Sequence, residues 1–243
     1  MDATPEIRQQ LAPRGALRAG VNLANILLVT GKTETGAPVG VSPDMARAVA
    51  DRLGVAVEYV AFASPGQVAD AVAEDRWDIA LIAHEAERAE TIAFSPAYVE
   101  IEATYLVRGG STVRSVDDID RPGTRIAVSA RSAYDLHLAR TLKHAELVRA
   151  EGLAGALALF TTRKLDALAG LRPALLDDVR SIPGARVLDG RFTTVRQAIG
   201  IRPGSHQASA FIAELVRQLR ADGTVQSLID RHGVTGRLQV GTD

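Results

Sequence analysis

Residues 42–83 decide the fold class and read SPDMARAVADRLGVAVEYVAFASPGQVADAVAEDRWDIALIA. A Ser-Pro pair opens each of two predicted helices, because serine caps free amide groups and proline fits the first helical turn. We expect Ser42 to cap the first helix and Gly54 to end it. Apolar runs at 55–62 and 78–83 predict strands. Strands that alternate with helices in this way predict an α/β protein with a mostly parallel sheet.

The same alternation continues through the rest of the chain. We expect further strands at residues 16–21, 100–107, 125–129, 146–150, 165–169, 186–188 and 194–201, and further helices at residues 132–142, 153–160, 173–179, 206–220 and 224–232. Strand-like segments near 102–108 and 193–200 join two such series. We therefore expect two lobes, with lobe 1 formed by residues 1–105 and 196–243 and lobe 2 by residues 106–195. A ligand cleft is expected where strand carboxyl ends and helix amino ends meet.

Composition narrows the function. The 243 residues carry a net charge of -1, which argues against general nucleic-acid binding, since that needs a basic surface. The chain contains no cysteine, which excludes thiolate metal sites and disulfides. No apolar run approaches the roughly 20 residues of a membrane span. Residues 1–15 lack the basic and apolar regions of a signal peptide, so we expect either a removed signal or a cytoplasmic protein.

Motifs of the common enzyme classes are absent from the sequence. It has no Gly-x-Ser-x-Gly nucleophile elbow, no phosphate-binding loop and no dinucleotide glycine fingerprint. The five histidines show no metal-ligand spacing. We therefore expect no cofactor, no metal site and no catalytic residue.

Several short segments share one order and spacing with a known family. They are Leu-Arg-Ala-Gly-Val at 17–21, Gly-Val-Ser-Pro-Asp-Met at 40–45, Trp-Asp-Ile-Ala-Leu-Ile at 77–82, Ala-Glu-Arg at 86–88, Ile-Ala-Phe-Ser-Pro-Ala-Tyr at 92–98 and the stretch 198–230. Together they resemble bacterial extracellular solute-binding proteins of the amino-acid type, which serve ABC importers. The resemblance covers residues 16–234. It implies an α/β, two-lobed periplasmic-binding-protein-like fold with two hinge crossings and a central cleft.

The resemblance also implies a function. The family binds small carboxylate-bearing solutes, either amino acids or related organic acids, without catalysis and closes by hinge motion. A monomer would deliver its solute to an ABC transporter permease, and its location would be the periplasm.

Arg88 is the first residue to which the resemblance assigns ligand binding. The matching arginine of the family holds the ligand carboxylate, and a guanidinium donates two parallel hydrogen bonds to such a group. The alternative is a surface arginine paired with a neighbouring glutamate. In the other lobe the resemblance assigns Ser132 and Ala133, at a strand-to-helix turn whose free amide groups bind anions. The alternative there is an ordinary helix cap by Ser132.

Further residues are assigned to the ligand-binding site by their positions beside these motifs. Asn22 and Asn25 follow the first strand, where the family lines its pocket, although asparagine also suits turns. Tyr134 follows the anion-binding turn and is assigned to the site with it. Tyr98 is either a wall of the cleft or part of the core.

The sequence departs from the family pattern in two places. Two residues are missing between Asp78 and Arg88, which puts His84 and Glu85 where hydroxyl residues usually contact the ligand. An acidic partner for the ligand ammonium is also missing after residue 166, and Arg172 stands beside its place.

Because of these departures, the sequence leaves alternatives for the class of ligand and for the function. The departures favour an acid without an α-ammonium group, unless Glu85 replaces the missing carboxylate, because a buried ammonium needs a partner. An enzyme resembling cyclohexadienyl dehydratases on the same scaffold is the alternative function, with His84 or Glu85 as its general acid. A sensor domain of a receptor is a third possibility.

Overall fold

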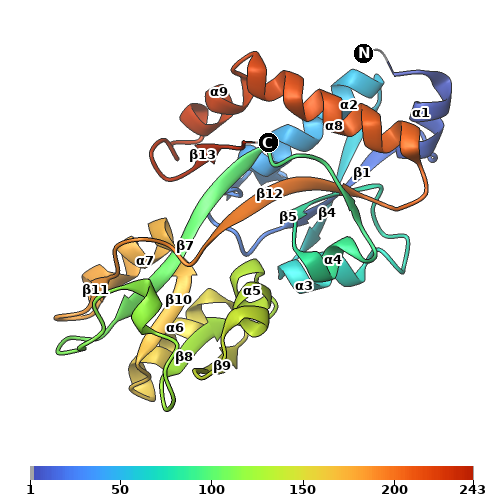
Figure 1. The fold of residues 1–243 in the computed structure, drawn as a ribbon. Coiled ribbons are helices and arrows are strands. Elements are labelled where there is room, and N and C mark those ends of the chain that lie inside the picture. Colours follow the sequence, from blue (N-terminus) through green and yellow to red (C-terminus); the bar gives the residue numbers. More distant parts are fainter. Residues whose placement is uncertain (1–2, 243) are drawn as a thin grey trace. The chain divides into compact units, whose positions relative to one another are not determined.

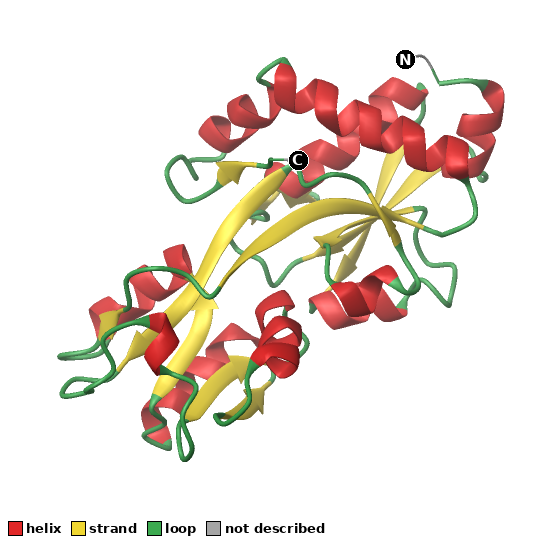
Figure 2. Cartoon of the chain, in the orientation of Figure 1, coloured by secondary structure: helices red, strands yellow, loops and turns green. Residues whose placement is uncertain are grey.

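The computed structural model describes residues 3–242, which divide into two compact units. Unit 1 holds the described residues up to Glu100 and from Arg196 onward, and unit 2 holds Ile101–Val195. The chain passes from one unit to the other along two long strands, β7 (Val99–Val107) and β12 (Thr193–Ile201) (Figure 1). Each unit combines strands with helices (Figure 2).

Unit 1 is built on a sheet with the strand order β4-β1-β5-β12. β1 (Ala16–Asn22) lies between β4 (Ala56–Phe62) and β5 (Ile79–Ala83) and is parallel to both, whereas β12 is antiparallel to β5. The parallel centre confirms the expectation from the alternating pattern. The other elements of the unit are α1 (Pro5–Leu11), β2 (Gly31–Lys32), β3 (Pro38–Val39), α2 (Val41–Leu53), α3 (Pro65–Asp70), α4 (Ala86–Ala89), β6 (Ala93–Phe94), α8 (His206–Ala221), α9 (Thr224–Arg231) and β13 (Gln239–Val240).

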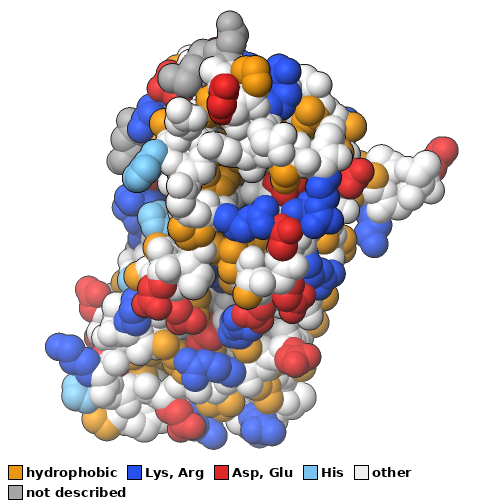
Figure 3. Space-filling view, turned by 90° about the vertical axis from the view of Figure 1, so that its right-hand side faces the viewer, with side chains coloured by type: hydrophobic (Ala, Val, Ile, Leu, Met, Phe, Trp, Pro, Cys, Tyr) orange, Lys and Arg blue, Asp and Glu red, His pale blue; other side chains and the backbone are white. Residues whose placement is uncertain are grey.

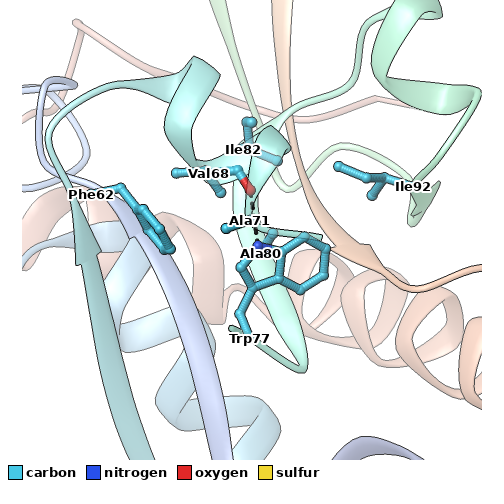
Figure 4. Packing of buried hydrophobic residues seen from close by; sticks show 7 residues of the cluster. All are labelled: Phe62, Val68, Ala71, Trp77, Ala80, Ile82 and Ile92. Carbon is cyan, nitrogen blue, oxygen red and sulfur yellow. Dashed lines mark hydrogen bonds between the residues drawn. The ribbon is translucent and has the colours of Figure 1, made fainter. Parts of the chain in front are cut away.

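A buried tryptophan organises one part of the core of unit 1. The indole Nε1 of Trp77 donates a hydrogen bond to the carbonyl oxygen of Val68 on α3 at 2.9 Å, which attaches that helix to the sheet (Figure 4). Gly20 on β1 allows this packing, because a Cβ atom there would lie 3.0 Å from the indole ring. The cluster consists of Phe62, Val68, Ala71, Trp77, Ala80, Ile82 and Ile92.

The start of α2 corrects one prediction. Ser42 does not cap the helix: Gly40 is the N-cap, and the Ser42 hydroxyl instead hydrogen bonds the Tyr98 hydroxyl at 2.8 Å. Gly40 has a φ of 151°, and a Cβ atom there would lie 2.2 Å from the carbonyl oxygen of Leu28. This glycine therefore turns the chain two residues earlier than the Ser-Pro pair indicated. Gly54 ends α2 in the left-handed conformation, as predicted.

Unit 2 is built on a sheet with the order β7-β10-β8-β9. β8 (Arg125–Ser129) is parallel to β9 (Glu146–Ala150) and β10 (Ala167–Leu171), and β10 is antiparallel to β7. The strand predicted at 165–169 begins two residues later, because Asp166 exchanges hydrogen bonds with the backbone of Arg125 at 2.8 and 3.0 Å. The other elements of the unit are η1 (Val116–Asp118), α5 (Ala133–Thr141), α6 (Gly152–Thr162), α7 (Arg172–Asp178), η2 (Val179–Ser181) and β11 (Arg186–Val187).

Candidate functional site

Unit 1 places its predicted site residues at or after the carboxyl ends of two central strands. Asn22 is the last residue of β1, and His84 and Glu85 directly follow β5. Because β1 and β5 are parallel neighbours, their carboxyl ends lie at one edge of the sheet. Arg88 lies on α4, and its Nη1 donates a hydrogen bond to the carbonyl oxygen of Ala83 at 2.9 Å.

Two charged groups at this edge are buried. Arg88 is 5 % exposed and Glu85 is 8 % exposed. Burial of a charge is costly unless the charge is paired, and neither group lacks a polar partner. Arg88 is therefore not the surface arginine of the alternative interpretation. Its contact with a ligand carboxylate stays a prediction.

His84 forms an aromatic face beside these charges. Its ring stacks on the ring of Phe94, with centroids 4.7 Å apart and planes inclined by 15°. Partial burial lowers the pKa of His84, and the nearby Arg196 lowers it further, whereas Glu85 raises it. We therefore treat the imidazole as neutral at pH 7.

The two asparagines have local structural roles. The Oδ1 of Asn22 accepts a hydrogen bond from the N–H of Ala24 at 3.1 Å, and that of Asn25 accepts one from Leu27 at 3.2 Å. These are the turn contacts of the alternative interpretation, and ligand binding by either residue stays a prediction. Tyr98 belongs to the core, since it is fully buried, and burial raises its pKa.

In unit 2 the chain turns from β8 into α5. The Ser132 side chain accepts the N–H of Asp135 at 3.1 Å, which confirms the predicted cap. Ala133 and Tyr134 are the first two residues of the helix, and such positions have no acceptor within a helix. Among the described residues, none accepts a hydrogen bond from these two amide groups. The turn therefore offers two adjacent N–H groups at the positive end of a helix dipole.

The Tyr134 side chain is buried in the same unit. It is 4 % exposed, and its hydroxyl makes no hydrogen bond within the described part of the chain. Burial raises the pKa of Tyr134 to about 12. The phenol is therefore neutral at physiological pH and retains its donor hydrogen.

Arg172 follows β10, at the same sheet edge as the turn after β8. Its Nε donates to the Glu102 carboxylate at 2.7 Å, and its other nitrogens donate to the carbonyl oxygens of Leu188 and Gly190. Arg191 also pairs with Glu102 at 2.8 Å. The Arg172 guanidinium holds the pKa of the Glu102 carboxyl below its ordinary value. All three side-chain nitrogens of Arg172 thus donate hydrogen bonds within unit 2. A ligand contact by this residue stays a prediction.

Two residues that support the turn were not predicted. The Asp135 carboxylate accepts the N–H of Arg131 at 2.8 Å and pairs with the Nε of Arg149 at 2.9 Å. A Ser-x-x-Asp spacing at a helix start is a known capping pattern, so the position of Asp135 relative to Ser132 carried a usable signal. No local pattern indicates Arg149, which reaches Asp135 from β9.

Three further features of the described residues bear on function. They contain no group of three or more His, Cys, Asp or Glu that could hold a metal ion. None of their helices is both long and apolar enough for a bilayer. Acidic and basic side chains intermingle on the face drawn in Figure 3.

Solved structures share the fold of this chain. A mutant of ArgBP from T. maritima has a TM-score of 0.74 at 21% identity, covering 93% of this chain and 98% of that one. A substrate-binding protein of an amino acid ABC transporter from Streptococcus pneumoniae, bound to L-arginine, also has a TM-score of 0.74 at 21% identity, covering 93% and 97%. The ancestral amino acid-binding protein AncCDT-1, a precursor of cyclohexadienyl dehydratase, has a TM-score of 0.75 at 23% identity, covering 92% and 97%.

Sequence comparison identifies the family. No curated protein matches the chain significantly. The model of the bacterial extracellular solute-binding proteins, family 3, matches residues 20–235. This match and the shared fold confirm the predicted fold class and the predicted family. The chain therefore belongs to the bacterial extracellular solute-binding proteins, family 3.

Proposed function

We propose that this chain binds a small carboxylate-bearing solute, an amino acid or a related organic acid, and does not transform it. The main observation in support is that each unit contains a group of a type that binds carboxylates. Unit 1 presents the Arg88 guanidinium beside the end of β5, and unit 2 presents the amide groups of Ala133 and Tyr134. A guanidinium and a helix amino end are both established carboxylate-binding groups. Membership of a solute-binding family supports the same function.

The proposed role is delivery to an ABC importer from the periplasm, by a monomer. A solute that contacts both units favours whichever arrangement lets it make both sets of contacts. The two connections, β7 and β12, are extended strands, so small dihedral changes at a few residues suffice to rotate one unit against the other. A transporter permease would recognise the solute-bound arrangement. The S. pneumoniae relative in this fold belongs to an amino acid ABC transporter, which supports this role.

The proposed solute is an organic acid without an α-ammonium group, such as a keto, hydroxy or dicarboxylic acid. No acidic residue occurs in β10 or at the start of α7, where the family pattern has a partner for the ligand ammonium. Glu102, which precedes the β7 residue paired with Leu171, is already paired with Arg172 and Arg191. An unpaired buried ammonium is costly, so only Glu85 of the predicted site residues remains as its partner.

Identification of the bound molecule tests this function. Purified protein is denatured, and mass spectrometry identifies the small molecules that it releases. We expect a carboxylate-bearing compound, which calorimetry then shows to rebind the refolded chain. The proposal is wrong if the released compound and a library of organic and amino acids all fail to bind.

A dehydratase is the second candidate function. His84 and Glu85 are adjacent titratable groups at the end of β5, where a general acid would be needed. AncCDT-1, which shares the fold, is described as a precursor of cyclohexadienyl dehydratase. Turnover of prephenate or arogenate by the wild-type chain that is lost in Glu85→Gln would establish this function instead.

A further inference from the structure

The turn between β8 and α5 depends on one residue in an unfavourable backbone conformation. Arg131 has a φ of 57°, in the left-handed region that glycine adopts readily and other residues avoid. Such a residue persists only where its surroundings hold it in place. Contacts that hold the backbone of Arg131 are therefore important for the shape of the turn.

Asp135 provides one such contact, to the backbone of Arg131. Its Oδ2 accepts the backbone N–H of Arg131 at 2.8 Å, and the Asp135 side chain is only 3 % exposed. The Nε of Arg149 lies 2.9 and 3.1 Å from the two carboxylate oxygens. Arg149 is held on β9 opposite Val128 of β8, so the counterion comes from the strand beside the turn.

Two backbone N–H groups of the turn have no acceptor among the described residues. The N–H of Ala130 donates to the carbonyl oxygen of Ala150 at 2.8 Å, and that of Arg131 donates to the Asp135 carboxylate. The N–H of Ser132 donates to the carbonyl oxygen of Ser129 at 3.2 Å, and that of Asp135 donates to the Ser132 hydroxyl at 3.1 Å. Those of Ala133 and Tyr134 have no acceptor among the described residues. The Asp135 contact with Arg131 is thus part of the arrangement that presents these two groups.

We propose that Asp135 is a positioning residue of the carboxylate site and that Arg149 is its counterion. The carboxylate of Asp135 holds Arg131 in the left-handed conformation and so fixes the direction of the two amide groups. Arg149 neutralises that carboxylate, which would otherwise repel an anion bound at the same helix end. The inference rests on the proposed function, because it assumes that the turn binds the carboxylate of the solute.

A helix-capping role alone does not explain these contacts. Ser132 already caps α5 through the N–H of Asp135. The Asp135 carboxylate instead accepts from Arg131, which precedes the helix. Its loss is therefore expected to change the turn more than the helix.

Acetate is the probe for the test, because it is the smallest carboxylate and needs no knowledge of the natural solute. The full chain is labelled with nitrogen-15, and the amide resonances of Ala133 and Tyr134 are followed during titration with sodium acetate. Sodium chloride at equal ionic strength is the reference. In the wild type we expect saturable shifts of both resonances with acetate.

Variants of Asp135 test the positioning. Asp135→Ala is expected to weaken acetate binding at least about tenfold, as for loss of a hydrogen bond to a charged group. Asp135→Asn keeps an oxygen acceptor for Arg131 and is expected to retain binding. The double variant Arg131→Gly with Asp135→Ala is expected to recover binding, because glycine adopts the left-handed conformation without support. Asp120→Ala is the matched control, since that carboxylate also holds backbone amide groups of unit 2.

Variants of Arg149 test the charge. Arg149→Gln leaves the Asp135 carboxylate without its counterion and is expected to weaken acetate binding about threefold, the range of a single ion-pair effect. Adding Asp135→Asn to Arg149→Gln removes both charges and is expected to restore binding. If the ion pair had only a structural role, acetate binding would not recover, because the double variant still lacks the pair.

The outcomes separate the two proposals. No response of Ala133 and Tyr134 to acetate in the wild type overturns the proposed function and this inference with it. A wild-type response that Asp135→Ala leaves unchanged overturns the inference alone. If Asp135→Ala does not fold, the two double variants test the inference in its place. The inference is overturned if neither of them binds acetate as well as the wild type.

Discussion

Arg18 and Asp78 are joined by four hydrogen bonds inside unit 1. The Asp78 carboxylate accepts the backbone N–H of Arg18 at 2.9 Å, its Nε at 3.2 Å and its Nη2 at 2.7 Å. In return, the N–H of Asp78 donates to the carbonyl oxygen of Arg18 at 2.8 Å. Both residues are buried, and together they fix β1 against the residue that precedes β5. The predicted site residues that follow these two strands depend on that alignment.

Removal of the Asp78 carboxylate is expected to destabilise the chain. Asp78→Ala leaves the buried guanidinium of Arg18 without its main partner, which costs about 3–5 kcal/mol of unfolding free energy. For a chain of this length the thermal midpoint should fall by roughly 10 °C in calorimetry. Arg14→Ala is the control, because its pair with Asp75 is exposed and should contribute less than about 1 kcal/mol. Equal effects of the two variants would contradict the assigned role of Asp78.

Arg88→Ala is expected to abolish most of the solute binding. Loss of one partner of a buried charge pair costs about 2–5 kcal/mol of binding free energy. Since Arg88 is buried and donates to Ala83, we also expect a loss of about 1–3 kcal/mol in stability. Arg88→Lys keeps the charge but loses the planar fork, so its affinity should be intermediate. Calorimetry with the released solute measures the affinity, and an unchanged value in Arg88→Ala would rule out the predicted contact.

A thermal-shift screen tests the solute class. Keto, hydroxy and dicarboxylic acids are compared with amino acids. A solute at ~100 times its dissociation constant adds about 2.7 kcal/mol, which corresponds to roughly 5–10 °C for this chain. We expect the shift from acids without an ammonium group, and no loss of it in Glu85→Gln. If only amino acids stabilise the chain and Glu85→Gln removes the effect, then Glu85 is the ammonium partner and the proposed class is wrong.

The tyrosines are expected to titrate late. Burial is the main cause that raises the pKa of Tyr59, Tyr98, Tyr105 and Tyr134, which are all the tyrosines of the chain. A raised pKa in the folded state adds stability below the unfolded pKa near 10, and that stability is lost as the pH rises above it. Tyrosinate absorbance should therefore appear at higher pH in the folded chain than in the urea-unfolded chain. Coincident titrations would contradict the burial of these groups.

Solute binding is expected to change the dimensions of the chain in solution. If a solute draws the two units into a closed arrangement, the radius of gyration falls in small-angle scattering when the solute is saturating. Arg88→Ala at the same solute concentration is the control, because it should remain unbound and unchanged. Profiles that superpose with and without a solute proven to bind would argue against hinge closure.

The sequence by itself determined the local structure and the family. β8 and β9 begin and end where their β-forming runs predicted, and Gly54 ends α2. The Ser132 cap was predictable because such a cap joins residues three apart. The order of the short motifs was sufficient to indicate the family that the comparison confirms.

Tertiary structure decided which side chains are engaged with one another. Arg172 pairs with Glu102, 70 residues away, and Ser42 bonds Tyr98, 56 residues away. Arg149 reaches Asp135 only because β9 lies beside β8. Such pairs depend on strand order and register, which follow from burial of the whole apolar surface and not from any local pattern. For this reason the sequence located the candidate residues along the chain, but only the folded structure showed which of their polar groups already have partners.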